Sequence, residues 1–442
     1  MITTSKEANP NYLAKIFKIE DIKKHPNADR LQIVIVDFMQ IITGMNAKLG
    51  DYYVYFPSES KINEEFLKFT NSFRDPKLNS NPSEKGMFEA NCRTKTIKLR
   101  DEFSSGYIIP LNILEAFCKV SGLERFQNEY FDTCNNILML KKYVPKSFRE
   151  KTLNQTKSGK TSKISLIKEN FFQFHTDTTN LRKNIYNLSP NDYISITYKI
   201  HGANLIIAKV PIKVELNTIE KGIKYLSKKI KSLKVNIVEE KYGIVISSRR
   251  VIKTVDDRTF EGNNFYDSDI WTFAGENIKN KIPESYSLYC ELCGFTQTGS
   301  PIQGEYTYGC SEKQHKIYVF KVVYTNPEGI RFILSTKESK EFCDSVGLEF
   351  VPIFYNGVAK DLFPNISIET HWHENFLKEL ENKFTEKDCY ICKKSGLPEE
   401  GIVLRIEKSF KEFQAYKLKS MRFLKKESDN LDKGVEDCDL EN

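Results

Sequence analysis

The residue that first suggests chemistry is a lysine in the run Tyr198-Lys-Ile-His-Gly-Ala-Asn204. A lysine at the end of a strand can present its amine as a nucleophile, and Gly202, three residues later, lets the backbone approach a phosphate closely. Neighbouring cations and partial desolvation favour loss of the lysine's proton near neutral pH. By itself, however, the pattern Lys-x-x-Gly is weak and common, and taken alone it favours a surface lysine before a turn.

Several downstream residues have the chemical types that contact nucleotides: carboxylates, cations and aromatic rings. In chain order they are Arg249, Glu291, Tyr318, Phe320, Glu400, Lys417 and Lys419. Glu291 stands out because it interrupts an apolar strand, where a carboxylate without a partner is costly to bury. Tyr318 and Phe320 are two residues apart, which predicts that both rings face the same side of a strand.

The elements before these residues are predicted to form a small β-barrel. Runs typical of strands cover residues 31–37, 52–56, 96–100 and 107–110, and a helix is predicted over 114–123. Short strands at this spacing favour an OB-fold, so residues 1–145 are interpreted as an OB-fold nucleic-acid-binding module. The segment His25-Pro-Asn-Ala-Asp-Arg-Leu31 resembles the opening of tRNA-binding OB modules, which suggests contact with RNA.

The remaining chain is predicted to contain a linker, a catalytic domain and a tail. Residues 146–168 are polar and lack periodicity, as is typical of a linker. Residues 169–425 mix strands and helices and form the expected catalytic domain, including an amphipathic helix over about 217–234. Residues 426–442 carry a net charge of −5 and are predicted to be a disordered acidic tail.

Composition limits the classes of partner and compartment. Without the tail, residues 1–425 carry about +12, which favours a polyanionic partner. The ten cysteines are scattered, the N-terminus has no apolar signal core, and no apolar run approaches about 18 residues. We therefore expect an intracellular protein of the cytoplasm or nucleus with no membrane span. The pairs Cys290/Cys293 and Cys389/Cys392 are too far apart in sequence for a common zinc site.

Taken in order, these motifs resemble the covalent nucleotidyltransferase superfamily of RNA ligases, DNA ligases and mRNA capping enzymes, over roughly residues 171–425. Lys199 to Gly202 match the nucleotidyl-lysine motif, and the two glutamates and the lysine pair match later motifs. His201 favours RNA ligases, because DNA ligases and capping enzymes usually have Asp at that place. Tyr198 departs from the family, in which an acidic residue often precedes the lysine.

Domain order narrows the resemblance further. Only 23 residues follow Lys419, so we expect no C-terminal OB domain. The arrangement is similar to the ATP-dependent RNA ligase branch with an N-terminal OB module, whose members seal nicks with RNA on the 3′-OH side. It implies an α+β fold, in which the OB-fold barrel is followed by an ATP-grasp-like ligase domain of antiparallel sheets flanked by helices.

The resemblance implies roles around the phosphates of ATP. Lys199 would form the covalent bond to AMP, and Lys417 and Lys419 would clamp the α-phosphate. His201 and Asn204 would orient the phosphate or the leaving group. The product of this step would be lysyl-AMP, from which AMP passes to a nucleic-acid 5′-phosphate before a 3′-OH seals the joint.

It also implies roles around the nucleoside and the metal ion. Arg249 would contact the ribose or the donor phosphate, and Glu291 would accept hydrogen bonds from ribose hydroxyls. Phe320, or alternatively Tyr318, would stack on adenine. Glu400 would bind Mg²⁺ (or Mn²⁺), which prefers oxygen ligands.

Two other interpretations remain open at this point. One is a capping-type guanylyltransferase, which would use GTP. The other is a non-catalytic RNA-binding protein built on a ligase-like core, although the intact motif residues argue against loss of activity. In each case the expected partner is RNA or an RNA-containing duplex, and the expected protein is a monomer.

Overall fold

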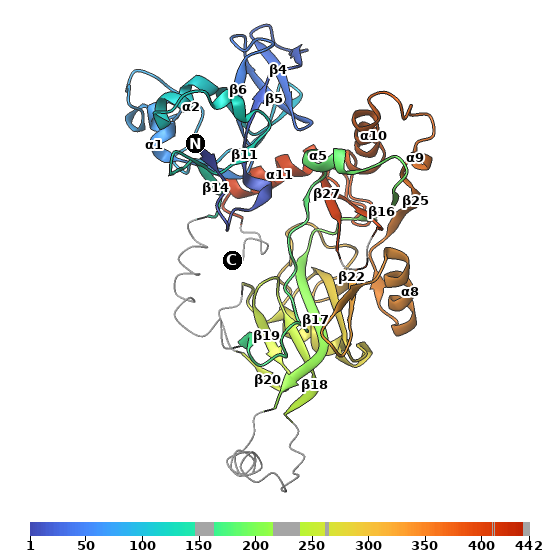
Figure 1. The fold of residues 1–442 in the computed structure, drawn as a ribbon. Helices are drawn as coiled ribbons and strands as arrows, with labels where there is room; N and C mark the ends of the chain where they lie inside the picture. Colours follow the sequence, from blue (N-terminus) through green and yellow to red (C-terminus); the bar gives the residue numbers. More distant parts are fainter. Residues whose placement is uncertain (146–162, 215–238, 261–264, 409, 411, 436–442) are drawn as a thin grey trace, which may run out of the picture.

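The computed structural model describes residues 1–145, 163–214, 239–260, 265–408, 410 and 412–435, and these residues form two units (Figure 1). The N-terminal module, blue to cyan in Figure 1, is rich in strands, and the larger domain, green to red, combines sheets with helices. The α+β class expected from the sequence is therefore confirmed.

The N-terminal module is built around short antiparallel strands. One sheet has the order β10-β6-β2-β11 and a second the order β3-β4-β5, while β8 pairs with β9 and β14 with β7. Side-chain hydrogen bonds join these pieces, since Gln40 on β5 donates to the Phe103 carbonyl on β9. The bounds are β2 (Ala14–Lys18), β3 (Ile22–Lys24), β4 (Leu31–Val36), β5 (Met39–Gly44), β6 (Tyr52–Phe56), β7 (Ser60–Ile62), β8 (Thr96–Leu99), β9 (Glu102–Ser105), β10 (Tyr107–Pro110), β11 (Tyr130–Phe131) and β14 (Leu140–Lys142).

Two helices and a small edge sheet complete the module. The helices are α1 (Glu64–Phe69) and α2 (Leu111–Cys118), and β1 (Ile2–Thr3), β12 (Thr133–Cys134) and β13 (Ile137–Leu138) form the edge sheet. Helix α2 begins at Leu111, before the predicted range of 114–123. It ends at Cys118, inside that range, because Lys119 adopts a left-handed conformation.

Two mainly antiparallel sheets form the larger domain, and in the shorter one β15 pairs with β27 in parallel. The longer sheet runs β20-β19-β18-β17-β21-β22-β23, with β24 parallel to β22, and the shorter runs β15-β27-β26-β16-β25. The longer sheet contains β17 (Ala203–Lys213), β18 (Glu240–Ser247), β19 (Ile252–Val255), β20 (Arg258–Thr259), β21 (Tyr286–Gly294), β22 (His315–Thr325), β23 (Arg331–Ile333) and β24 (Glu349–Phe350). The shorter contains β15 (Thr179–Asn180), β16 (Tyr193–Tyr198), β25 (Ile353–Val358), β26 (Gly401–Ile406) and β27 (Ala415–Lys419).

Helices cover the sheets through apolar faces. Trp271 and Ala274 of α7 (Ile270–Ile278) and Cys343 of α8 (Thr336–Val346) belong to the core of the longer sheet. Trp372 and Phe376 of α10 (Trp372–Leu380) pack on the shorter sheet. Two short helices, α5 (Leu181–Asn184) and α9 (Ala359–Leu362), connect strands at its edge. Within the described ranges, no helix combines the length and the apolar character needed to cross a membrane.

Helix α11 (Met421–Asp432) corrects the predicted tail. Ser420 caps this helix by accepting a hydrogen bond from the Phe423 amide, and the helix then runs beneath the N-terminal module (Figure 1). There Ser428 donates a 2.5 Å hydrogen bond to Glu59, and Arg93 forms an ion pair with Asp432. A disordered tail from residue 426 was therefore the wrong prediction for 426–432, because contacts with a distant domain order this polar sequence. Residues 436–442 lie outside the described residues.

Two other predictions fall mainly on residues that are not described. The predicted helix over 217–234 and residues 146–162 of the predicted linker lie outside the described ranges. The end of that linker packs on the catalytic domain, since Ile167 is buried and forms a β-bridge with Ile212.

Candidate functional site

Lys199 lies where the two sheets of the larger domain meet. Strand β16 of the shorter sheet ends at Tyr198, and β17 of the longer sheet begins at Ala203. The Lys199 amide donates to the Gly401 carbonyl at 3.0 Å, and the Gly202 amide donates to Glu291 Oε1 at 3.1 Å. The connection between the sheets is thus anchored on both sides.

Gly202 is required at its position for steric reasons. A Cβ there would lie 2.4 Å from the Leu292 carbonyl oxygen and 2.9 Å from Glu291 Cγ. Such contacts are far shorter than van der Waals packing permits. Glycine therefore allows the loop after the lysine to approach β21, which brings the Glu291 carboxylate next to the nucleophile.

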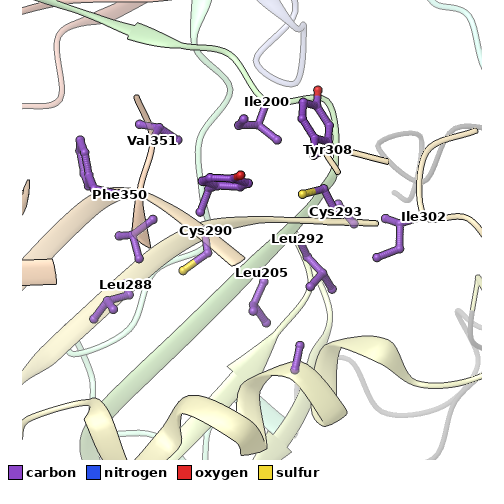
Figure 2. Close-up of a cluster of buried hydrophobic side chains, with 14 of the residues drawn as sticks. Ile200, Leu205, Leu288, Cys290, Leu292, Cys293, Ile302, Tyr308, Phe350 and Val351 are labelled. Carbon is purple, nitrogen blue, oxygen red and sulfur yellow. The ribbon is translucent and has the colours of Figure 1, made fainter. Parts of the chain in front are cut away.

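A buried apolar cluster supports this loop from below. Ile200, Leu205 and Leu292 belong to it, and Figure 2 shows them together with Tyr308. The Tyr308 hydroxyl accepts a 2.6 Å hydrogen bond from the His201 amide. Tyr198, which replaces the acidic residue common in the family, is buried, and its hydroxyl lies 3.3 Å from Cys389 Sγ. Its polar group therefore points into the core.

A narrow pocket of about 170 Å³ opens beside Lys199. Of the predicted site residues, it is lined by Lys199, Asn204, Arg249, Glu291, Phe320, Lys417 and Lys419. Phe320, Phe413 and His175 add rings to this lining. We call this cavity the lysine pocket.

Glu400 pairs with Lys199. Its Oε1 lies 2.7 Å from Lys199 Nζ and 3.5 Å from Lys419 Nζ, and Lys419 also contacts Glu427 at 3.1 Å. Burial is the largest single influence and favours a neutral Lys199 amine, but the charges of Glu400 and Glu291 and the hydrogen bond to Glu400 together outweigh it, so the pKa of Lys199 is raised above its ordinary value. The prediction that Lys199 loses its proton near neutral pH is therefore wrong for the protein without nucleotide, because the sequence did not reveal this carboxylate contact.

Lys417 has the opposite environment. Burial and the charges of Lys419 and Lys199 lower the pKa of Lys417 to about 7. The lysine most easily deprotonated in this cluster is thus a neighbour of the nucleophile. A bound polyanion would favour the charged form of Lys417, since opposite charge stabilises an ammonium.

Glu400 has the chemistry that a divalent cation requires. It is 2% exposed and lies beneath the two lysines, and within the described residues its Oε2 receives no hydrogen bond. A buried carboxylate oxygen without a donor suits a hard cation. No trio of His, Cys, Asp or Glu side chains that could hold a metal ion is found in the described chain. A cation at Glu400 would therefore take most of its ligands from phosphate and water, as Mg²⁺ commonly does.

Asn204, Glu291 and Arg249 form another part of the pocket wall. Asn204 is buried, and in the described part of the chain no donor reaches its Oδ1. Glu291 Oε1 accepts from the Gly202 amide, so this carboxylate is held at the pocket wall. Arg249 forms an ion pair with Asp177, which belongs to a Thr-Asp segment (residues 176–178) that precedes Lys199.

The two candidate adenine-stacking rings separate in the structure. Tyr318 is buried in the core under the longer sheet, whereas Phe320 lines the lysine pocket. The reason is a β-bulge: Cys290 pairs with Val319, but the preceding Tyr289 pairs with Lys321, so Phe320 is an extra residue. The prediction that both rings face one side is therefore wrong, and Phe320 is the ring placed to contact a base.

His201 lies at the edge of the site. It does not line the lysine pocket but faces a second cavity, with its ring 4.9 Å from those of Tyr306 and Phe423. Its Nδ1 is 3.9 Å from Glu400 Oε2. This position leaves His201 outside the lysine pocket, on the side where Glu400 lies.

Sequence reasoning missed wall residues from distant segments, above all Tyr12 and Lys142 of the N-terminal module and Glu427 of α11. Tyr12 is carried in by a short 3-10 helix (Pro10–Tyr12) that docks on the Thr-Asp segment. Asn9 donates to Asp177 at 3.3 Å, and Asn11 donates to the Thr178 carbonyl at 3.3 Å. No sequence signal could have found them, because their role depends on how the two domains pack.

The fold joins a strand-rich module to a two-sheet domain, and a lysine, a carboxylate and a lysine pair converge on one pocket. These features define a nucleotidyltransferase of the polynucleotide-ligase type. Comparison with known families agrees: a model described as RNA ligase matches residues 192–421, more than half of the chain, and an OB-fold domain model matches residues 13–111. The chain belongs to the RNA ligase family and carries an N-terminal OB-fold domain.

Solved structures show the same fold over nearly the whole length. Naegleria gruberi RNA ligase with PPi is 16% identical, with a TM-score of 0.56, over 95% of this chain and 99% of that chain in the alignment. A mutant of the same enzyme solved with ATP and Mn also has 16% identity and a TM-score of 0.56, over 94% of this chain and 98% of that one. No curated protein sequence matches the chain.

Proposed function

We propose that this RNA ligase is ATP-dependent and joins a 3′-OH to a 5′-phosphate through lysyl-AMP on Lys199. The observation that carries the proposal is that Lys199, Lys417 and Lys419 line one pocket while the buried Glu400 contacts both Lys199 and Lys419. The N. gruberi enzyme solved with ATP and Mn supports the choice of nucleotide and of a divalent cation. We infer a monomer that acts on nicks in duplexes with RNA on the 3′-OH side.

The first step forms the covalent intermediate. Lys199 Nζ attacks the α-phosphorus of ATP, the bond to the β-phosphate oxygen breaks, and pyrophosphate leaves. Lys199 must be neutral to attack, and the charge of Lys419 favours this by destabilising the Lys199 ammonium. Glu400 has the opposite effect, so the amine becomes reactive only when this carboxylate no longer pairs with it. A divalent cation near Glu400 would supply positive charge to the phosphates.

The remaining pocket residues orient the nucleotide. Lys417 and Lys419 are placed to hold the α-phosphate, since both line the pocket beside Lys199. Glu291 is placed to accept hydrogen bonds from the ribose. Phe320 supplies a face for adenine, because the bulge on β22 turns it into the pocket.

Two further transfers complete the reaction. An oxygen of the RNA 5′-phosphate attacks the α-phosphorus of lysyl-AMP, the phosphorus–nitrogen bond breaks, and Lys199 takes up a proton. A 3′-OH then attacks the 5′-phosphorus, forms the phosphodiester and releases AMP. In each transfer, positioning and charge stabilisation by the pocket provide most of the catalysis.

The test is covalent labelling. The protein is incubated with α-labelled ATP and Mg²⁺, denatured and examined for acid-labile label. We expect labelled wild type, unlabelled Lys199→Ala, and unchanged labelling in Lys337→Ala, a control at an exposed lysine on α8. An unlabelled wild type, or a labelled Lys199→Ala, would contradict the proposal.

Two comparisons refine this result. Labelling by GTP in place of ATP would instead indicate a capping-type guanylyltransferase, and absence of label with retained RNA binding would indicate a non-catalytic protein. Sealing of nicked duplexes with ribose or deoxyribose at the 3′-OH side tests the substrate. Equal rates on both duplexes would contradict the assignment of RNA to that side.

A further inference from the structure

A second cavity, of about 500 Å³, opens beside the lysine pocket. It lies where the N-terminal module, α11 and residues 301–306 meet, and we call it the junction cavity. Tyr12, Lys142 and Glu427 line both cavities, so the two are adjacent. Its size falls in the range of sites that bind molecules as large as a nucleotide.

The junction cavity is attached to the nucleophile loop. His201 lines it, and Gln303 on the same wall donates a 3.1 Å hydrogen bond to the Gly202 carbonyl. A group held in this cavity therefore sits next to the position that the α-phosphate of lysyl-AMP would take. The loop that carries Lys199 also fixes this wall of the junction cavity.

Aromatic side chains form much of the wall. The Tyr266 hydroxyl donates to the Ile302 carbonyl at 2.8 Å, and the Tyr306 hydroxyl donates to the Pro398 carbonyl at 2.8 Å. Because both hydroxyls are already hydrogen-bonded, Tyr266 and Tyr306 would contact a ligand through their rings. Tyr143 adds a ring from the N-terminal module, 5.4 Å from the Arg93 guanidinium.

Charge in the junction cavity does not oppose a polyanion. Lys142 and Lys426 supply cations at its wall. Three carboxylates are also present, and each is paired: Glu59 with Arg93, Glu427 with Lys419, and Glu305 with both Lys394 and Lys426, so the two lysines outnumber that carboxylate. Rings combined with lysines are the features that bind single-stranded nucleic acid, through base stacking and attraction of the backbone.

We propose that the junction cavity binds the first nucleotide of the RNA strand that carries the 5′-phosphate. This inference rests on the proposed function, because that strand must bring its phosphate to lysyl-AMP. The base would pack against Tyr143 and Tyr266, and the backbone would lie near Lys142 and Lys426. Both domains and α11 would then hold the end to be activated.

A substitution that fills the cavity tests this assignment. Asn430 on α11 lines the cavity, so Asn430→Trp introduces a large side chain from the helix. Lys433→Trp places the same side chain at the exposed end of that helix and serves as the matched control. Transfer of AMP from pre-labelled protein to a 5′-phosphorylated oligoribonucleotide is measured in a single turnover. We expect transfer by Asn430→Trp to be about tenfold slower or more, and transfer by Lys433→Trp to match wild type.

A second pair of variants approaches the cavity from the other domain. Tyr143→Ala removes a ring and should weaken binding of the same oligoribonucleotide about tenfold, whereas Tyr143→Phe keeps the ring and should restore it. Tyr143→Ala and Tyr143→Phe therefore test the assignment of the junction cavity even if Asn430→Trp does not fold.

The outcomes separate the two hypotheses. Unlabelled wild type overturns the proposed function itself. A different result overturns only the junction cavity as the RNA site. In that case ATP labelling is normal, Asn430→Trp transfers AMP at the wild-type rate, and Tyr143→Ala binds RNA as tightly as wild type. An equal loss of ATP labelling and RNA transfer in Asn430→Trp also overturns it, because the cavity would then serve ATP or pyrophosphate.

Discussion

Lys321 is a buried lysine whose replacement should stabilise the protein in a pH-dependent way. It follows Phe320 on β22 and is 6% exposed. Its Nζ lies 3.6 Å from the centroid of the Tyr289 ring and 3.4 Å from His175 Nδ1, and no carboxylate of the described chain forms an ion pair with it. Burial, together with the charges of Arg331 and Arg405, lowers the pKa of Lys321 from 10.5 to about 7.

The size and sign of the effect follow from this pKa. The difference between 10.5 and about 7 corresponds to roughly 5 kcal/mol at 1.36 kcal/mol per pKa unit. Between these pH values the unfolded chain binds a proton that the folded protein does not, so the free energy of unfolding rises with pH. Lys321→Met keeps a similar volume without the charge. The variant should gain most stability at or below pH 7 and lose this advantage toward pH 10.5.

Lost contacts reduce the gain. Where Lys321 is charged, at and below about pH 7, its cation–π contact with Tyr289 contributes about 1–2 kcal/mol. We therefore expect Lys321→Met to be more stable than wild type by roughly 2–4 kcal/mol near pH 7, with the difference shrinking by about 1.4 kcal/mol per pH unit above that.

Urea unfolding at pH 6, 7, 8 and 9 measures this difference. Lys337→Met, on the exposed surface of α8, controls for the general loss of a positive charge. A stability difference between Lys321→Met and wild type that stays constant from pH 7 to 9 would refute the reasoning, because it would show that Lys321 keeps its proton throughout.

Three further substitutions test the site and the domain contact. Gly202→Ala should slow lysine adenylylation about 100-fold through displacement of the nucleophile loop, measured by single-turnover labelling; a rate near wild type would contradict the steric argument. Phe320→Leu should raise the KM for ATP about tenfold or more, while Tyr318→Phe should not, and equal effects would reject the assignment of the two rings. Arg93→Ala leaves the buried Glu59 without its cation and should lower the free energy of unfolding by about 3–5 kcal/mol in urea titrations, with no change if the ion pair is unimportant.

The chemistry of the site was largely predictable from the sequence. Lys199, Glu291, Glu400, Lys417 and Lys419 were identified from residue type and order, and the structure brings them together around one pocket or directly beneath it. This works because each residue sits at or next to a strand whose apolar pattern is clear, and neighbouring strands then bring the side chains together.

What the sequence could not reveal depends on backbone irregularity and on domain packing. The bulge at Phe320 breaks the two-residue alternation, so a correct strand prediction still misplaced Tyr318. Tyr12 and Lys142 enter the pocket from another domain. Helix α11 has a polar, charged sequence typical of a tail, and only its contacts with the N-terminal module order it.

The contact between α11 and the N-terminal module has a consequence for how the protein is made. A ribosome releases the N-terminal module first, and domains generally fold as they emerge. Tyr12 and Lys142 are therefore in place long before Glu427, the last pocket residue along the chain. The wall of the lysine pocket is completed only when α11 has left the exit tunnel and docked on a module synthesised hundreds of residues earlier. An unfinished chain thus lacks the closed pocket, and the ability to take up a nucleotide arrives late in synthesis.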